Sequence, residues 1–161
     1  MMRIYFLRHG KAENRDEWRG DDASRPLTAE GEAAMRREAK AVRAMDLALD
    51  VIVTSPLVRA RQTAELVAEE LGLSGRLVVD DRLAGGFDVR RLEQVAAAHP
   101  EAETIMVVGH EPDFSATVAE LIGGGDIVFK KGGLARVDVT APVAGGGRLV
   151  WLLTPPLLGS R

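Results

Sequence analysis

Short Val- and Ile-rich runs alternate with longer segments of helical periodicity along this chain, and this alternation constrains the fold most. We expect strands at residues 3–7, 50–54, 76–79, 104–108, 135–139 and 148–153. A strand, a helix and a second strand in succession are typical of βαβ units, which build parallel sheets. The expected class is therefore α/β, with three layers: a central, mostly parallel sheet of about five to six strands, flanked by helices.

Helices are expected between these runs. Thr28 suits the N-cap of a helix over 28–45, and Ser55 and Pro56 suit the start of a helix that Gly72 closes. Two further helices are expected over 89–98 and from about 112 to 123. The polar stretch 11–26 is long for a connection between a strand and a helix, and long loops in compact domains are often functional. The Gly-rich stretch 141–147 indicates a hairpin, so the last two strands are expected to be antiparallel.

Length and charge limit the classes of function. The chain has 161 residues, which suits a single domain over 1–161, and its formal net charge is −3, so there is no basic footprint for nucleic acid. It has no cysteine, and the N-terminal apolar run reaches Arg8 too soon for a signal peptide. No apolar run approaches the roughly 20 residues of a membrane helix. We therefore expect a cytoplasmic protein that binds neither nucleic acid nor membrane.

Cations and histidines follow three of the expected strands. Arg8 and His9 end the first run, Arg59 falls in the first helical turn after the second, and His110 follows the run at 104–108. Because ligands bind beyond the carboxyl ends of parallel strands, these four side chains are expected to converge there. A cation in a first helical turn is disfavoured by the helix dipole, and a bound anion would reverse that effect.

Other residues in these segments have simpler explanations or supporting roles. We expect Arg61 to be a solvated surface residue and His99 to have a structural role at a helix end. Gly10 and Gly109 would let the backbone approach a ligand closely beside the two histidines. A zinc site is a weak alternative, because the two histidines have no clear third ligand at metal spacing.

The four converging side chains predict phosphoryl chemistry. Arginine forks match phosphate oxygens and stay charged at all relevant pH values, and a neutral imidazole can carry a phosphoryl group covalently. Fixed cations around the equatorial oxygens stabilise the transferred group. Neither a Walker lysine motif nor an obvious carboxylate pair for Mg²⁺ is present. We therefore expect phosphoryl transfer through histidine, without a metal or another cofactor.

Five segments resemble the histidine phosphatase superfamily, whose fold is also called phosphoglycerate mutase-like. They are LRHGKAE at 7–13, RPLTAEG at 25–31, TSPLVRARQTAE at 54–65, VVGHEPD at 107–113 and KKGGLARVDV at 130–139. The small size and the later segments are most similar to the SixA-type phosphohistidine phosphatases. The resemblance implies that His9 is the nucleophile, that Arg8, Arg59 and His110 surround the phosphoryl group, and that Arg25 lies at the pocket edge.

The sequence departs from the family at the leaving-group acid of the larger, ester-cleaving members. Ala84 or Gly85 stands where that acid would align. Four carboxyls remain open as proton donors: Asp81, Asp88, Glu111 and Asp113.

The leading hypothesis is a metal-independent phosphatase that acts on protein phosphohistidine through phospho-His9. Its partner would be a phosphohistidine-bearing protein, such as a phosphotransfer domain, or a small phosphorylated substrate. The alternatives are a small-molecule phosphomonoesterase of the same superfamily and, less favoured, a phospho-binding module without turnover.

Overall fold

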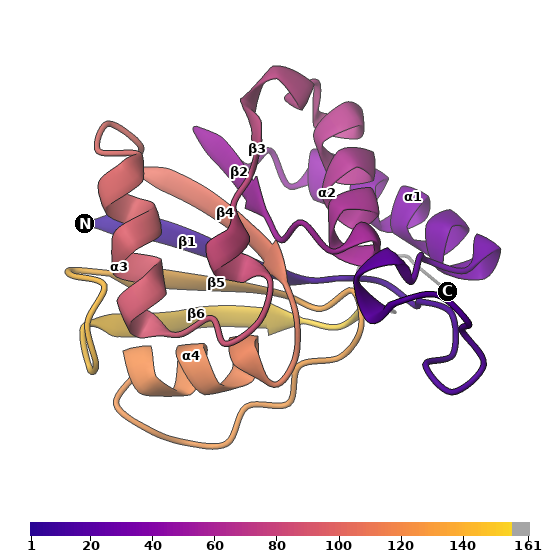
Figure 1. Ribbon diagram of the computed structural model, residues 1–161. Helices are drawn as coiled ribbons and strands as arrows, with labels where there is room; N and C mark the ends of the chain where they lie inside the picture. Colours follow the sequence, from indigo (N-terminus) through magenta and orange to yellow (C-terminus); the bar gives the residue numbers. More distant parts are fainter. Residues whose placement is uncertain (156–161) are drawn as a thin grey trace.

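The computed structural model describes residues 1–155, whose strands form one sheet (Figure 1). The strand order is β3-β2-β4-β1-β5-β6. Strands β3, β2, β4 and β1 are parallel neighbours, whereas β5 is antiparallel to both β1 and β6. The bounds are β1 Met2–Arg8, β2 Val51–Thr54, β3 Leu77–Val79, β4 Thr104–Gly109, β5 Leu134–Val139 and β6 Gly147–Leu153. The expected class, a mostly parallel six-stranded sheet, is confirmed.

Two pairs of helices cover the two faces of the sheet (Figure 1). Tyr5 and Leu7 on β1 point into the core beneath α1 and α2, whereas Ile4 and Phe6 point into the core beneath α3 and α4. This split follows from the strand geometry, in which successive side chains face opposite sides. The bounds are α1 Ala29–Ala44, α2 Val58–Leu71, α3 Val89–Ala98 and α4 Asp113–Leu121. The sheet with its two helical layers gives the three layers expected.

The helix boundaries follow the predicted signals with one exception. Thr28 caps α1 by accepting a hydrogen bond from the Gly31 amide, and Gly72 ends α2 in the left-handed region with φ of 70°. The expected helix start, with Ser55 as the cap and Pro56 as the first residue, is wrong, because α2 begins later, at Val58, with Leu57 as its N-cap. The Ser55 hydroxyl instead lies 2.7 Å from Nε2 of His110, which directly follows β4. As expected, β5 and β6 form an antiparallel hairpin.

The 11–26 loop connects β1 to α1 and includes a short 3₁₀ turn, η1, at Asp22–Ser24. An antiparallel bridge between Ala12 and Leu27 closes its base. A Cβ on Gly31 would lie 2.0 Å from the Lys11 carbonyl oxygen, so only glycine lets α1 begin against this loop. Within residues 1–155, no helix is long and apolar enough to span a bilayer.

Candidate active site

Three strand ends bring the predicted residues together. In the sheet, β4 lies between β2 and β1, with Arg8 opposite Gly109 and Thr54 opposite Val108. The residues that follow each strand are therefore neighbours as well. The His9 amide donates to the Gly109 carbonyl at 3.1 Å, and the His9 and His110 ring centroids lie 5.3 Å apart. The backbone ladder thus fixes the separation of the two histidines.

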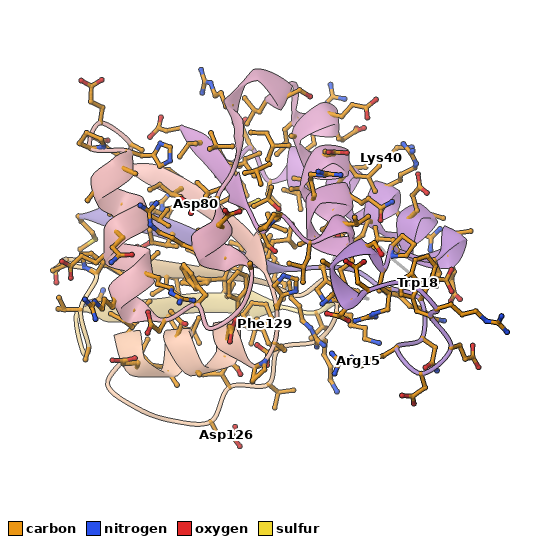
Figure 2. All side chains as sticks on the ribbon, in the orientation of Figure 1. Arg15, Trp18, Lys40, Asp80, Asp126 and Phe129 are labelled. Carbon is orange, nitrogen blue, oxygen red and sulfur yellow. The ribbon has the colours of Figure 1, made fainter. Side chains whose placement is uncertain are left out.

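A cavity of about 570 Å³ opens over these strand ends. All five residues predicted from the sequence line it, namely Arg8, His9, Arg25, Arg59 and His110. The remaining lining comes mainly from the 11–26 loop, including Arg15, which is labelled in Figure 2, with Glu111 and Lys131 completing the wall. The long 11–26 loop thus borders the pocket. Lys131 is a pocket residue that the sequence interpretation did not single out.

The His9 ring presents one particular nitrogen to the pocket. Its Nδ1 lies 2.7 Å from the Gly10 carbonyl oxygen. A carbonyl can only accept a hydrogen bond, so Nδ1 carries the ring proton and Nε2 keeps its lone pair. The side chain is 7% exposed, so this ring orientation is packed into place. His9 therefore offers an unprotonated Nε2, the form a nucleophile requires.

Both site histidines are held in the neutral form. Burial, reinforced by the charges of His110, Arg59 and Arg8, lowers the pKa of His9 to about 3, although its bond to the Gly10 carbonyl acts in the opposite direction. Burial, with the Arg59 charge, lowers the pKa of His110 to about 4. Desolvation disfavours the charged imidazolium in each case. At neutral pH, the pocket is therefore lined by two uncharged imidazoles among guanidinium groups.

Three buried nitrogen atoms at the site have no hydrogen-bond partner among residues 1–155. They are Nε of Arg8, Nε of Arg59 and Nδ1 of His110. Buried polar groups are normally paired, so each such atom needs an explanation. Arg8 is held in place by a bond of 2.7 Å from Nη1 to the carbonyl of Phe129, which is labelled in Figure 2. The arrangement suits a ligand that brings several hydrogen-bond acceptors at once.

Asp22 organises the arginines and was missed in the sequence. Its Oδ2 accepts from Arg59 Nη2 at 3.0 Å, its Oδ1 accepts from Arg25 Nε at 3.1 Å, and its carbonyl accepts from Arg59 Nη1 at 2.8 Å. Burial raises the pKa of Asp22, but the bonds and charges of the two arginines outweigh that effect and the pKa is lowered overall. Arg25, predicted at the pocket edge, also donates to the Glu13 carbonyl at 2.7 Å. This network fastens the 11–26 loop to α2.

Of the four carboxyls left open as proton donors, Glu111 alone is among the lining residues of the described pocket. Its Oε1 accepts a hydrogen bond from the Ser115 amide at 2.7 Å. Asp88 instead caps α3, Asp113 accepts from the Phe87 amide, and Asp81 lies in a 3₁₀ turn. Ala84 and Gly85 are likewise outside the lining.

Gly10 and Gly109 have a different role from the one expected. A Cβ on Gly10 would lie 2.6 Å from Met35 Cγ, and a Cβ on Gly109 would lie 2.8 Å from Phe114 Cζ. The space beside each glycine is therefore filled by a core side chain. Both glycines allow the helices to pack closely against the histidine-bearing strand ends, so the expectation that they make room for a ligand is wrong.

Two residues set aside in the sequence interpretation lie outside the cavity. Arg61 is 47% exposed and pairs with Glu65 on the surface of α2, as expected. His99 is the C-cap residue of α3. Among residues 1–155, no group of three or more His, Cys, Asp or Glu side chains is arranged to hold a metal ion.

The comparisons with known proteins identify the family. The model of the histidine phosphatase superfamily (branch 1) matches residues 4–86. This chain belongs to the histidine phosphatase superfamily. The match runs from β1 through α1, β2, α2 and β3, and it includes Arg8, His9 and Arg59.

Individual relatives within the superfamily extend the match to nearly the whole chain. Phosphohistidine phosphatase SixA of Escherichia coli K12 is 28% identical over 157 residues, covering 96% of this chain and 94% of that protein. An uncharacterized protein of a Picosynechococcus strain is 41% identical over 115 residues, covering 70% of this chain and 68% of that one. A structure of SixA complexed with tungstate superimposes with a TM-score of 0.83 at 28% identity, covering 98% of this chain and 99% of that one. These relatives support a phosphatase of the superfamily with a SixA-like fold.

Proposed function

We propose that this chain is a metal-independent phosphatase that removes phosphoryl groups from protein phosphohistidine through a covalent phospho-His9 intermediate. The observation that carries the proposal is that His9 lines one cavity with Arg8, Arg59 and His110. Each of these three has a buried nitrogen without a hydrogen-bond partner among residues 1–155: Arg8 Nε, Arg59 Nε and His110 Nδ1. A phosphoryl group brings three acceptor oxygens and negative charge, which match two guanidinium N–H groups and one imidazole nitrogen. SixA was solved with tungstate, a tetrahedral oxyanion like phosphate.

In the first step, the His9 Nε2 lone pair forms a bond to phosphorus while the P–N bond of the substrate breaks. The electron pair of that bond passes to the leaving imidazole nitrogen. The leaving ring departs as neutral imidazole, because its other nitrogen carries a proton throughout. Phospho-His9 retains its own proton on Nδ1, where the Gly10 carbonyl accepts it at 2.7 Å. Arg8 and Arg59 stabilise the charge on the equatorial oxygens.

In the second step, water attacks phosphorus and the N–P bond to His9 breaks. The electron pair returns to His9 Nε2, and both water protons remain on the released dihydrogen phosphate. The enzyme regains its starting tautomer, with Nδ1 still protonated. Dividing one displacement into two steps through the same nitrogen atom is the function of a covalent nucleophile.

The nature of the leaving group favours P–N over P–O substrates. An alkoxide is a strong base and needs a proton as it departs, which a placed general acid supplies. Asp81, Asp88 and Asp113 do not line the pocket, and the fourth carboxyl, that of Glu111, accepts a hydrogen bond from the Ser115 amide. A protonated phosphoimidazole needs no such acid, because imidazole, whose conjugate acid has an ordinary pKa of about 6.5, leaves as a neutral molecule. The site therefore suits phosphohistidine better than a phosphate ester.

The deciding experiment compares kcat/KM for a phosphohistidine peptide with that for a phosphoserine peptide in EDTA. Since a general acid contributes about 10²–10⁴ in rate, the phosphohistidine peptide should be preferred by roughly that factor. Equal or reversed preference would refute the substrate assignment and favour a phosphomonoesterase. Loss of turnover on chelation would refute the metal-free mechanism.

The role of His9 is tested with His9→Ala and a matched control, His99→Ala. Wild type and the control should accumulate alkali-stable, acid-labile phosphate on the protein, and His9→Ala should not. Turnover should also vanish in His9→Ala while its thermal unfolding stays close to that of wild type, since His9 lies at a strand end beside the cavity. A His9→Ala variant that keeps more than a few per cent of the wild-type rate would remove His9 from this role.

A further inference from the structure

The Ser55 hydroxyl lies between a backbone amide and a site histidine. Ser55 follows β2 directly, and its amide donates to the Val108 carbonyl of β4 at 3.0 Å. Its Oγ lies 3.2 Å from the Leu57 amide nitrogen and 2.7 Å from His110 Nε2. The residue is 0% exposed, so no solvent competes for the hydroxyl. The sheet thus places a single hydroxyl against the inner nitrogen of His110.

The directions of these hydrogen bonds follow from counting protons. The Leu57 N–H can only donate, so Ser55 Oγ accepts from it. The hydroxyl proton then needs an acceptor, and His110 Nε2 is the ring nitrogen within reach. A neutral imidazole has one donor and one acceptor nitrogen, so an accepting Nε2 leaves the ring proton on Nδ1. That Nδ1 is the buried atom without a partner among residues 1–155.

We propose that Ser55 is a positioning residue that fixes His110 in its Nδ1–H tautomer and so aims an N–H donor at the phosphoryl group. The proposal rests on the proposed function, because the acceptor for that N–H is the transferred phosphoryl oxygen. His9 carries its proton on the same atom, but there Nδ1 faces the Gly10 carbonyl and Nε2 faces the pocket. Two histidines of one tautomer therefore present opposite functions: His9 a lone pair and His110 a donor.

The opposite tautomer would damage the site. If His110 carried its proton on Nε2, its Nδ1 would point a lone pair at the phosphoryl oxygens, which also carry lone pairs and negative charge. The interaction would change from attraction to repulsion. Holding the proton on Nδ1 costs little at the moment of reaction, because the Ser55 hydroxyl is already buried and oriented. Such preorganised donors are a main source of stabilisation in charge-developing transition states.

The tautomer is measured directly by long-range ¹H–¹⁵N correlation spectra of the imidazoles. The chain has three histidines, so His99→Gln and His110→Gln variants suffice to assign the signals. In the wild type, His110 should show a protonated Nδ1 and an unprotonated Nε2. In Ser55→Ala, the spectrum should change to Nε2–H or to a mixture of both tautomers. A wild-type His110 protonated on Nε2 would overturn the proposal, whether or not the enzyme turns over.

Kinetics and oxyanion binding test whether the Ser55 hydroxyl contributes to phosphoryl binding and turnover through His110. Ser55→Ala should lower kcat/KM by about 10²-fold, the usual effect of losing one preorganised donor, and should weaken tungstate binding. Ser55→Thr, which keeps the hydroxyl, should recover most of the rate. The matched control is Thr117→Val, which removes another buried hydroxyl. The Thr117 hydroxyl donates to the Asp113 carbonyl at 2.7 Å, and Thr117 does not line the pocket. Its rate should equal that of wild type.

The outcomes separate this proposal from the proposed function. Wild-type protein with His110 protonated on Nδ1 but without turnover of any phosphohistidine peptide would refute the function and leave the tautomer assignment standing. Active wild-type protein whose Ser55→Ala variant keeps both the tautomer and the rate would refute the role of Ser55 alone. If Ser55→Ala does not fold, the wild-type spectrum together with Ser55→Thr still decides the assignment.

Discussion

Glu38 is the least expected buried group in the molecule. It lies on α1, is 0% exposed, and neither carboxyl oxygen has a hydrogen-bond partner among residues 1–155. A Cβ on Gly132 would lie 2.8 Å from its Oε1, so the carboxyl is pressed against the Gly132 turn, whose amide donates to the His9 carbonyl. Burial raises the pKa of Glu38 from 4.5 to about 8. At neutral pH the folded protein therefore holds this side chain protonated.

This raised pKa implies a defined pH dependence of stability. Between pH 4.5 and about 8, the unfolded chain loses the proton of Glu38 while the folded chain keeps it. The free energy of unfolding therefore falls by about 1.4 kcal/mol per pH unit across this window. The contribution is fully present below pH 4.5, and the accumulated loss is about 3 kcal/mol at pH 7 and about 5 kcal/mol above pH 8.

Glu38→Gln removes the titration while keeping the size and polarity of the protonated side chain. The variant should be more stable than wild type by an amount that grows by about 1.4 kcal/mol per pH unit between pH 5 and 8, measured by denaturant unfolding. The matched control is Glu32→Gln on the same helix, where Glu32 pairs with Arg36 on the surface. Its effect should be about 0.5 kcal/mol or less, because surface ion pairs contribute little to stability. A Glu38→Gln difference that stays constant from pH 5 to 8 would refute the reasoning.

Three further outcomes are expected. Arg59→Lys should lower kcat/KM by about 10²–10³-fold, since an ammonium cannot make the Arg59 bonds to Asp22 and a phosphoryl oxygen together, whereas Arg61→Lys should be neutral. Near-wild-type activity of Arg59→Lys would exclude Arg59 from the pocket chemistry. Amides in 11–26 should exchange faster than those of β1 and slow on vanadate binding, because this loop lines the cavity; unchanged exchange would make it an ordinary surface loop. Because burial lowers the pKa values of His9 and His110 to about 3 and 4, their NMR signals should not titrate between pH 8 and 5, and a midpoint near 6.5 would contradict their burial.

Local patterns predicted the layout of the fold and of the site. Each expected strand is present to within one residue at either end, because runs of Val and Ile bounded by turn residues are a strong local signal. Arg8, His9, Arg59 and His110 were found together because parallel strands place their carboxyl ends at one edge, so strand-end residues converge whatever their separation in the chain.

The features that the sequence did not predict depend on partners far apart in the chain. Asp22 joins Arg59 across 37 positions, and Ser55 joins His110 across 55. Locally, a serine before proline indicates a helix cap, and that signal was overridden when a neighbouring strand brought an imidazole to its hydroxyl. Glu38 is a similar case, since a charged residue on a helix is usually solvent-exposed. Tertiary contacts decided each of these.

The position of His9 within the backbone ladder has a consequence for how such proteins diversify. Its amide is bonded to Gly109 and its carbonyl to Gly132, so the nucleophile belongs to the sheet, while much of the pocket wall belongs to the 11–26 loop. Apart from Asp22, which holds Arg59, the loop can change in length and charge without moving the attacking nitrogen. Exchanging the loop between relatives while keeping Asp22 should therefore transfer substrate choice and preserve the reaction chemistry.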